Sequence, residues 1–125
     1  MGVATSTLTE KDEEQRGALV DRMFHGAIAV LEMLSIYVGD RLGLYRVLAD
    51  KDPLTANQFA RASGIDERYA REWLEQQAVA GFVEVEKASA DNALRTYRLP
   101  SGHAEVLLDP DSLNYLVPLT WAIPG

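Results

Sequence analysis

The chain has 125 residues, which is enough for one folded domain with a buried core. It contains no cysteine, and this excludes a disulfide framework, a thiolate nucleophile and a cysteine-based zinc site. Its net charge is −7, so any contact with DNA phosphates would have to rest on a local basic patch.

The start of the chain is polar, small or charged, and residues 1–16 are therefore predicted to be a disordered or frayed segment. Within it, Thr9 is followed three residues later by Asp12, a spacing that can start a helix. Residues 1–6 also fit the N-myristoylation pattern, although that pattern asks for little more than a glycine and a hydroxyl residue.

Neither a secretion signal nor a membrane span is predicted. The first apolar run, residues 27–38, lies too deep in the chain for a signal peptide, and Glu32 interrupts it. It is also shorter than the roughly 20 residues that cross a bilayer. Together with the absence of cysteine, this favours a cytoplasmic protein.

A long apolar helix is predicted over residues 18–38, because apolar residues recur there at steps of three and four. Further apolar residues fill its other faces, so the helix needs cover on more than one side. We expect a second copy of the chain to supply that cover; the alternative is the central core helix of a monomer. The residues predicted to form this homodimer interface are Leu19, Met23, Phe24, Ala27, Ile28, Leu31 and Leu34.

Glycines then interrupt the apolar run. Gly39 and Gly43 are expected to break the long helix, and a short helix is predicted over residues 42–48. Residues 50–53 predict a turn, because Pro53 disfavours helical backbone at the residue before it.

Two further helices are predicted with a tight turn between them. Thr55 and Gln58 have the spacing of a capping box at the start of the first, which ends at Gly64. Asp66 is the expected N-cap of the second, and Gly81 is expected to stop it. This is the sequence signature of a helix-turn-helix.

Alternating residues over 82–86 and an apolar segment over 94–99 predict two strands that form a wing. A helix is expected over 103–108 and a last apolar helix over 113–121. The predicted fold class is mainly α with a small β-hairpin: a winged helix-turn-helix preceded by long dimerisation helices. Residues 17–125 are expected to form this single winged-helix-like dimerisation domain.

The second helix of the helix-turn-helix would enter the major groove of a DNA-binding protein. Here it is acidic, with four carboxylates against two arginines. The arginines, Arg68 and Arg71, have a simpler use in pairs along the helix, and the expected pairs are Glu67–Arg71 or Arg71–Glu75. DNA recognition by this helix is therefore disfavoured.

No cluster of residues predicts catalysis, a metal site or a cofactor site in this chain. His25 and His103 lie far apart, and His25 is expected to be a partly buried, hydrogen-bonded residue. Asp40 and Arg41 are expected to form a structural pair, and the glycines around them lack the spacing of a dinucleotide fingerprint.

Aromatic residues offer one further binding hypothesis. Tyr37, Tyr45, Tyr69 and Trp73 could line a pocket for an aromatic ligand, but their helical spacing favours a place in the core.

Three segments resemble the N-terminal region of a bacterial family of S-adenosylmethionine-dependent methyltransferases. They are LSIYVGDRLGLYRVLAD, PLTANQFARASGIDERYAREWLEQQAVAGFVEV and YRLPSGHAEVLL, and the resemblance extends over about residues 18–120. Their shared order and spacing make the match more specific than a generic helix-turn-helix.

The resemblance implies a winged-helix module that forms the homodimer and helps to roof the substrate pocket. It implies Tyr37, Tyr45 and Trp73 as candidates for the substrate lid, and S-adenosylmethionine as cofactor of the parent enzyme. The family's catalytic and cofactor-binding residues belong to a following Rossmann-like domain, and the sequence shows no strand and Gly-rich loop of that kind.

Three functions follow from the sequence. The first is a non-catalytic dimerisation and substrate-lid domain of a methyltransferase, lacking the cofactor-binding domain. The second is a winged-helix transcriptional regulator that binds DNA, and the third is a separate small-ligand binder that uses Tyr37, Tyr45 and Trp73.

Overall fold

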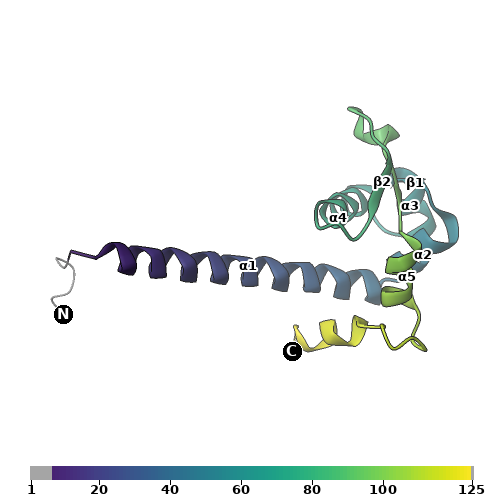
Figure 1. The fold of residues 1–125 in the computed structure, drawn as a ribbon. Coiled ribbons are helices and arrows are strands. Elements are labelled where there is room, and N and C mark those ends of the chain that lie inside the picture. Colours follow the sequence, from purple (N-terminus) through teal and green to yellow (C-terminus); the bar gives the residue numbers. More distant parts are fainter. Residues whose placement is uncertain (1–6, 125) are drawn as a thin grey trace. The chain divides into compact units, whose positions relative to one another are not determined.

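The structure is a computed structural model that describes residues 7–124. Residues 1–6, which carry the N-myristoylation pattern, lie outside this range. The chain divides into two compact units, one up to Leu31 and one from Glu32 onward. Helix α1 (Glu10–Arg41) is continuous across this boundary (Figure 1).

The start of α1 shows that the prediction of a frayed segment up to residue 16 is wrong from Glu10 onward. The backbone N–H of Asp12 donates to Thr9 Oγ1 at 3.1 Å, and the Thr9 N–H donates to the Asp12 carboxylate at 3.1 Å. These reciprocal bonds satisfy N–H groups that a helix start otherwise leaves free. Hydrogen bonding by Thr9, its backbone N–H above all, also lowers the pKa of the Asp12 carboxyl group, because it favours the charged form.

The helix-turn-helix follows the predicted caps. After α2 (Leu44–Lys51), helix α3 (Ala56–Ser63) begins with the capping box, in which the Gln58 N–H donates to Thr55 Oγ1 at 3.2 Å. Helix α4 (Glu67–Val79) begins with Asp66, whose carboxylate accepts from two backbone N–H groups. Gly81, with φ of 83°, turns the chain after α4, as expected of a glycine beyond a helix end.

A three-stranded antiparallel sheet completes the winged helix. Its strands are β1 (Leu54–Thr55), β2 (Glu84–Lys87) and β3 (Thr96–Arg98), in the order β1-β3-β2. The predicted hairpin is the β2–β3 pair, with the short helix η1 (Asn92–Leu94) in its loop. Strand β1 was not predicted, because two residues are too few to form an alternating pattern.

The C-terminal part contains α5 (Ser101–Leu108) and the short 3-10 helix η2 (Val117–Ala122). The predicted helix over 113–121 is therefore wrong in its first half. The Glu105 carboxylate accepts hydrogen bonds from Ser112 Oγ at 2.6 Å and from Asn114 Nδ2 at 2.9 Å. These bonds lower the pKa of Glu105 and hold the chain after α5 in a turn.

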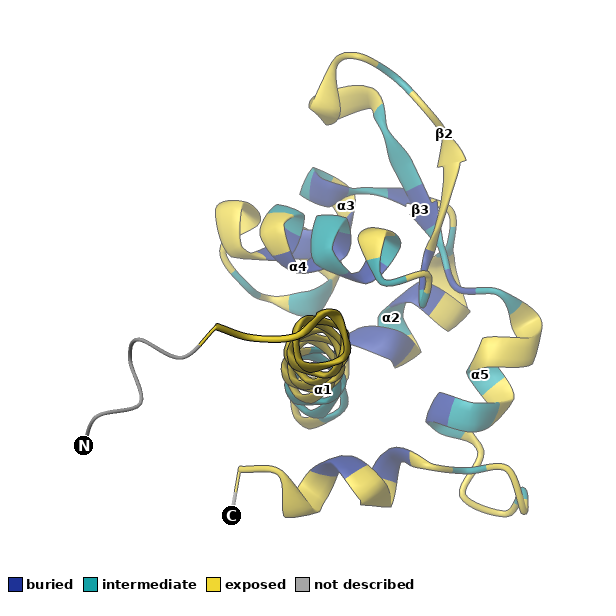
Figure 2. Ribbon diagram, turned by 60° about the vertical axis from the view of Figure 1, so that its left-hand side comes forward, coloured by how far each residue is buried: buried dark blue, intermediate teal, exposed yellow. Residues whose placement is uncertain are grey.

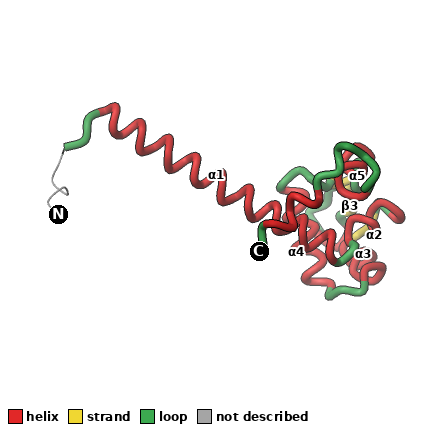
Figure 3. The backbone as a smooth tube through the Cα atoms, turned by 90° about the horizontal axis from the view of Figure 1, so that it is seen from below, coloured by secondary structure: helices red, strands yellow, loops and turns green. Residues whose placement is uncertain are grey.

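Helices dominate the described residues (Figure 3), and together with the small sheet they confirm the predicted fold class, a mainly α winged helix-turn-helix. The role of the long first helix in dimerisation stays a prediction. Between residues 7 and 124, no helix has the length and apolar character to cross a membrane. The core of the second unit lies where α2, α3 and α4 meet β3 (Figure 2), and its most deeply buried apolar side chains are Leu44, Tyr45, Leu48, Phe59, Leu74 and Tyr97.

Candidate functional site

The apolar side chains of α1 in the first unit are exposed. Met23, Phe24 and Leu31 each expose about two-thirds of their surface, at 67%, 68% and 64%. Large apolar side chains exposed together on one helix are the usual mark of a binding surface. Of the predicted interface residues, Leu19, Ala27 and Ile28 are also exposed, and Leu34 is half-buried.

The last turns of α1, which belong to the second unit, pack on α4. Trp73 Nε1 donates to the Ser35 carbonyl oxygen at 3.1 Å, and Gln77 Nε2 donates to Ser35 Oγ at 2.9 Å. Gly39 is buried at this contact, where an added Cβ would lie 2.5 Å from Trp73 Cζ2 and 2.7 Å from Tyr45 Cε2. The prediction that Gly39 breaks the helix is therefore wrong: the glycine permits close packing, and α1 continues to Arg41.

Two of the three predicted lid residues lie in the core, which is the place that their helical spacing favoured. Tyr45 is 1% exposed, and its ring meets that of Trp73 edge to face at 5.1 Å between centroids. Trp73 also stacks on Phe59 at 5.8 Å. Burial raises the pKa of the Tyr45 hydroxyl group, so this side chain stays protonated. Tyr37 is half-buried on α1.

Trp73 also reaches a surface cavity. It lines a cavity of about 210 Å³ together with Ser35, Tyr69, Glu72 and Gln76. Tyr37 and Tyr45 are not among the residues of this cavity, so the cavity does not unite the three predicted lid residues.

Gln77 is a buried polar residue that the sequence analysis missed. It accepts a hydrogen bond from the Tyr45 hydroxyl group and donates one to Ser35, so its amide is satisfied although it is fully buried. Its burial could have been inferred from its position on α4, because a residue one helical turn after Trp73 faces the same side of the helix, toward the core.

The arginines of α4 bear on the DNA-binding hypothesis. Arg68 pairs with Glu72 at 3.3 Å, with 82% and 63% of the two side chains exposed. The observed pair is neither of the two that the sequence predicted, which joined Arg71 with Glu67 or with Glu75. The wrong choice of partners is unsurprising, because exposed pairs contribute only about 0.2–1 kcal/mol and select their partners weakly.

The arginines of the wing also form ion pairs or hydrogen bonds within the wing. Arg98 on β3 lies 3.5 Å from Glu84 and 3.7 Å from Glu86, both on β2. Arg95 Nη2 donates to the Ser89 carbonyl oxygen at 3.1 Å. These side chains therefore face carboxylates or the wing's own backbone.

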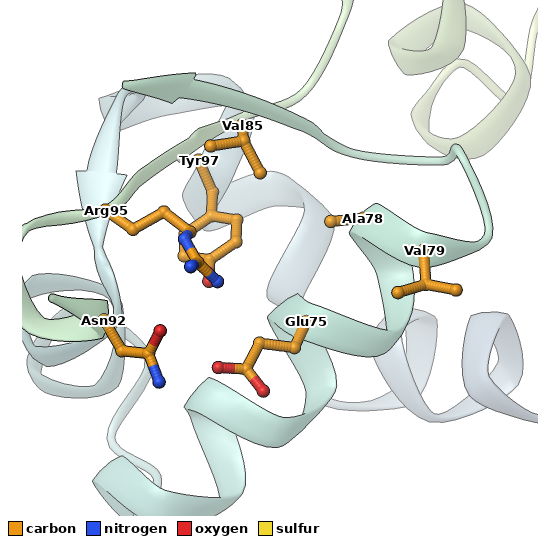
Figure 4. Close-up of a pocket in the computed structure, with 7 residues that line it drawn as sticks. All are labelled: Glu75, Ala78, Val79, Val85, Asn92, Arg95 and Tyr97. Carbon is orange, nitrogen blue, oxygen red and sulfur yellow. The ribbon is translucent and has the colours of Figure 1, made fainter. Parts of the chain in front are cut away.

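A surface cavity of about 430 Å³ separates α4 from the wing (Figure 4). It is lined by Glu75 from α4, by Asn92 from η1, and by Arg95, Tyr97 and Val85 from the wing. The carboxylate of Glu75 would repel a DNA phosphate that entered this cavity. Its negative charge also offsets the positive charge of Arg95.

A family model described as the Rv2258c-like winged HTH domain matches residues 27–108 of this chain. The chain belongs to this family. The match begins inside α1 and ends with α5, so it covers the helix-turn-helix, the wing and the α1 turns that pack on α4.

The chain also resembles a solved structure, that of human N-acetylserotonin methyltransferase in complex with SAM. The TM-score is 0.58 and the sequence identity is 17%, over 86% of this chain and 27% of the methyltransferase chain. At this identity the likeness shows the fold, and the chain spans about a quarter of the length of the methyltransferase. No curated protein matches the sequence.

The two histidines and Asp40 make hydrogen bonds within the chain. The Nδ1 atom of His25 lies 2.7 Å from the Asp21 carbonyl oxygen, and that of His103 lies 2.8 Å from the Phe82 carbonyl oxygen. His25 is exposed, so the prediction of partial burial is wrong. The Asp40 carboxylate accepts from Trp121 Nε1 at 3.4 Å.

Within residues 7–124, no three His, Asp or Glu side chains are grouped closely enough to hold a metal ion. The candidate functional features of the part described are therefore the apolar surface of α1 and the charged surface of α4 and the wing.

Proposed function

We propose that this Rv2258c-like domain is the non-catalytic dimerisation and substrate-lid domain of a cytoplasmic S-adenosylmethionine-dependent methyltransferase. The observation that carries the proposal is the exposed apolar surface of α1, with Met23, Phe24 and Leu31 at its centre. The fold likeness to a methyltransferase supports the enzyme class. In this proposal, a separate domain binds the cofactor and the small-molecule substrate.

The exposed apolar side chains of α1 supply a driving force for association. Burying a large apolar side chain completely contributes roughly 1.5–3 kcal/mol, and a two-fold interface buries each residue twice. The loss of translational and rotational freedom costs an estimated 4–15 kcal/mol, which several such residues offset. This balance supports the proposed homodimer.

The substrate-lid role is assigned to Tyr37 and to the surface edge of Trp73. Tyr45 supports Trp73 from the core side, where their rings meet at 5.1 Å. An aromatic side chain held in this way presents a rigid apolar edge to a ligand, and such edges are common in small-molecule pockets. The rest of the pocket would come from the separate domain.

Light scattering on the purified chain tests the dimer. At micromolar concentration we expect a mass of twice the 13.8 kDa of one chain. A mass of 13.8 kDa at the same concentration would contradict the proposal.

The winged helix-turn-helix itself raises a second candidate function, DNA binding by α4. We expect no complex in a gel-shift experiment at low salt, because Arg68 faces Glu72 and Arg98 faces two carboxylates. Arg68→Ala and Arg71→Ala should leave that result unchanged. A salt-dependent complex that weakens on either substitution would favour the regulator instead.

A further inference from the structure

Five residues of α1 lie at intervals of seven, which places them along one stripe of the helix. In chain order the stripe reads acid, valine, alanine, leucine, base. Its two ends carry opposite charges, its intermediate positions are apolar, and its centre is small. The residues of the stripe are Glu13, Val20, Ala27, Leu34 and Arg41.

The stripe is not the side of α1 that packs on the winged helix. Ser35 and Gly39 make the contacts with α4. At 3.6 residues per turn, Leu34 and Arg41 lie on a different face from these two residues. Glu13, Val20, Ala27 and Arg41 are exposed, and Leu34 is half-buried.

The stripe is complementary to itself when it is reversed about Ala27. Val20 and Leu34 are equally far from Ala27 on its two sides, and so are Glu13 and Arg41. The same reversal exchanges Met23 with Leu31 beside the stripe. A helix with this arrangement can pair with an identical helix that runs in the opposite direction.

We propose that α1 packs antiparallel against α1 of a second copy, with the two-fold axis at Ala27. Val20 then meets the partner's Leu34, and Glu13 meets the partner's Arg41. Alanine at the axis lets the helices approach closely, because each Ala27 meets its own copy. This proposal rests on the proposed dimerisation function and adds the direction and register of the pairing.

Charge decides between this arrangement and its competitors. A parallel pair would set Glu13 against the partner's Glu13 and Arg41 against the partner's Arg41, so like charges would meet at both ends. An antiparallel pair shifted by seven residues would set Glu13 against the partner's Leu34. Arg41 would then no longer lie opposite the partner's Glu13. Only the register centred on Ala27 pairs both charges and both large apolar residues.

Cysteine cross-linking tests the pairing, because the chain has no cysteine of its own. Val20→Cys and Leu34→Cys chains, made separately, are mixed and oxidised with copper–phenanthroline. A disulfide needs Cα atoms within about 4.4–6.8 Å. We expect a covalent dimer in the mixture of the two variants and none with either variant alone, as judged on a non-reducing gel.

Charge reversal supplies an independent readout. Glu13→Arg and Arg41→Glu should each weaken the dimer about tenfold, because each creates two like-charge contacts across the two-fold axis. The double variant should restore the dissociation constant to within about threefold of the original. Glu14→Arg makes the same charge change beside the stripe and should leave dimerisation unaltered.

The outcomes separate this proposal from the one on which it rests. A dimer in which Val20→Cys alone cross-links would establish parallel helices and overturn the antiparallel pairing. A dimer that gives no disulfide in the mixture, or in which the double charge reversal fails to restore affinity, would overturn the register. A monomeric unmodified chain would refute the dimerisation function itself.

Discussion

Leu31→Asp is expected to convert the dimer into a monomer, with at least a hundredfold rise in the dissociation constant. The substitution removes a leucine that is 64% exposed in the single chain and places a carboxylate in the interface. The lost burial contributes roughly 1.5–3 kcal/mol per copy, and the buried charge adds a further penalty in each copy. Light scattering over a dilution series measures the change.

Ile28→Asp should act in the same direction, because Ile28 is another exposed apolar residue of α1. Leu113→Asp is the matched control, since Leu113 is fully exposed outside α1. It should leave the mass of the dimer unchanged. Far-UV circular dichroism should be the same for all three variants, because none alters the core. If the Leu31→Asp protein stays dimeric at nanomolar concentration, α1 is not part of the dimer interface.

Gly39→Ala is expected to lower the free energy of unfolding by about 2 kcal/mol. Its Cβ would lie 2.5 Å from Trp73 Cζ2 and 2.7 Å from Tyr45 Cε2, and both rings are held by the core. Overpacking of this kind costs typically 1–3 kcal/mol, occasionally more, which exceeds the gain of up to about 1 kcal/mol from replacing glycine in a helix. Urea denaturation followed by circular dichroism gives the value.

Gly17→Ala provides the comparison for that experiment. Gly17 lies in the same helix, and an added Cβ there would have no neighbour within 4 Å. The free energy of unfolding should rise by about 0.5–1 kcal/mol, because only the helix preference changes. Equal effects of the two substitutions would show that Gly39 is not a packing glycine.

The parts of the fold that could be predicted from the sequence are those fixed by neighbours in the chain. Thr55 with Gln58, Asp66 and Gly81 each determine a helix end through bonds or backbone angles that span a few residues. The structure therefore confirms the helix ends that were predicted at these residues. The exposed apolar side of α1 also follows from spacing alone, and its role in a homodimer stays a prediction.

The parts that could not be predicted depend on contacts between separate elements or on small energy differences between alternative partners. Gly39 resembled a helix break because its partners, Trp73 and Tyr45, come later in the chain. The Glu105 hydrogen bonds that replace the first half of the last helix also join separate segments. Exposed ion pairs such as Arg68–Glu72 are decided by small energies, so spacing alone could not select them.

Both tryptophans of the chain are bound to the same helix. The indole of Trp73 donates to the Ser35 carbonyl oxygen, and that of Trp121 donates to the Asp40 carboxylate, so each indole touches the last turns of α1. Indole emission is sensitive to hydrogen bonding and to the entry of water. The intrinsic tryptophan fluorescence should therefore change when these two hydrogen bonds to the last turns of α1 break. It reports loss of this contact without an added dye or tag.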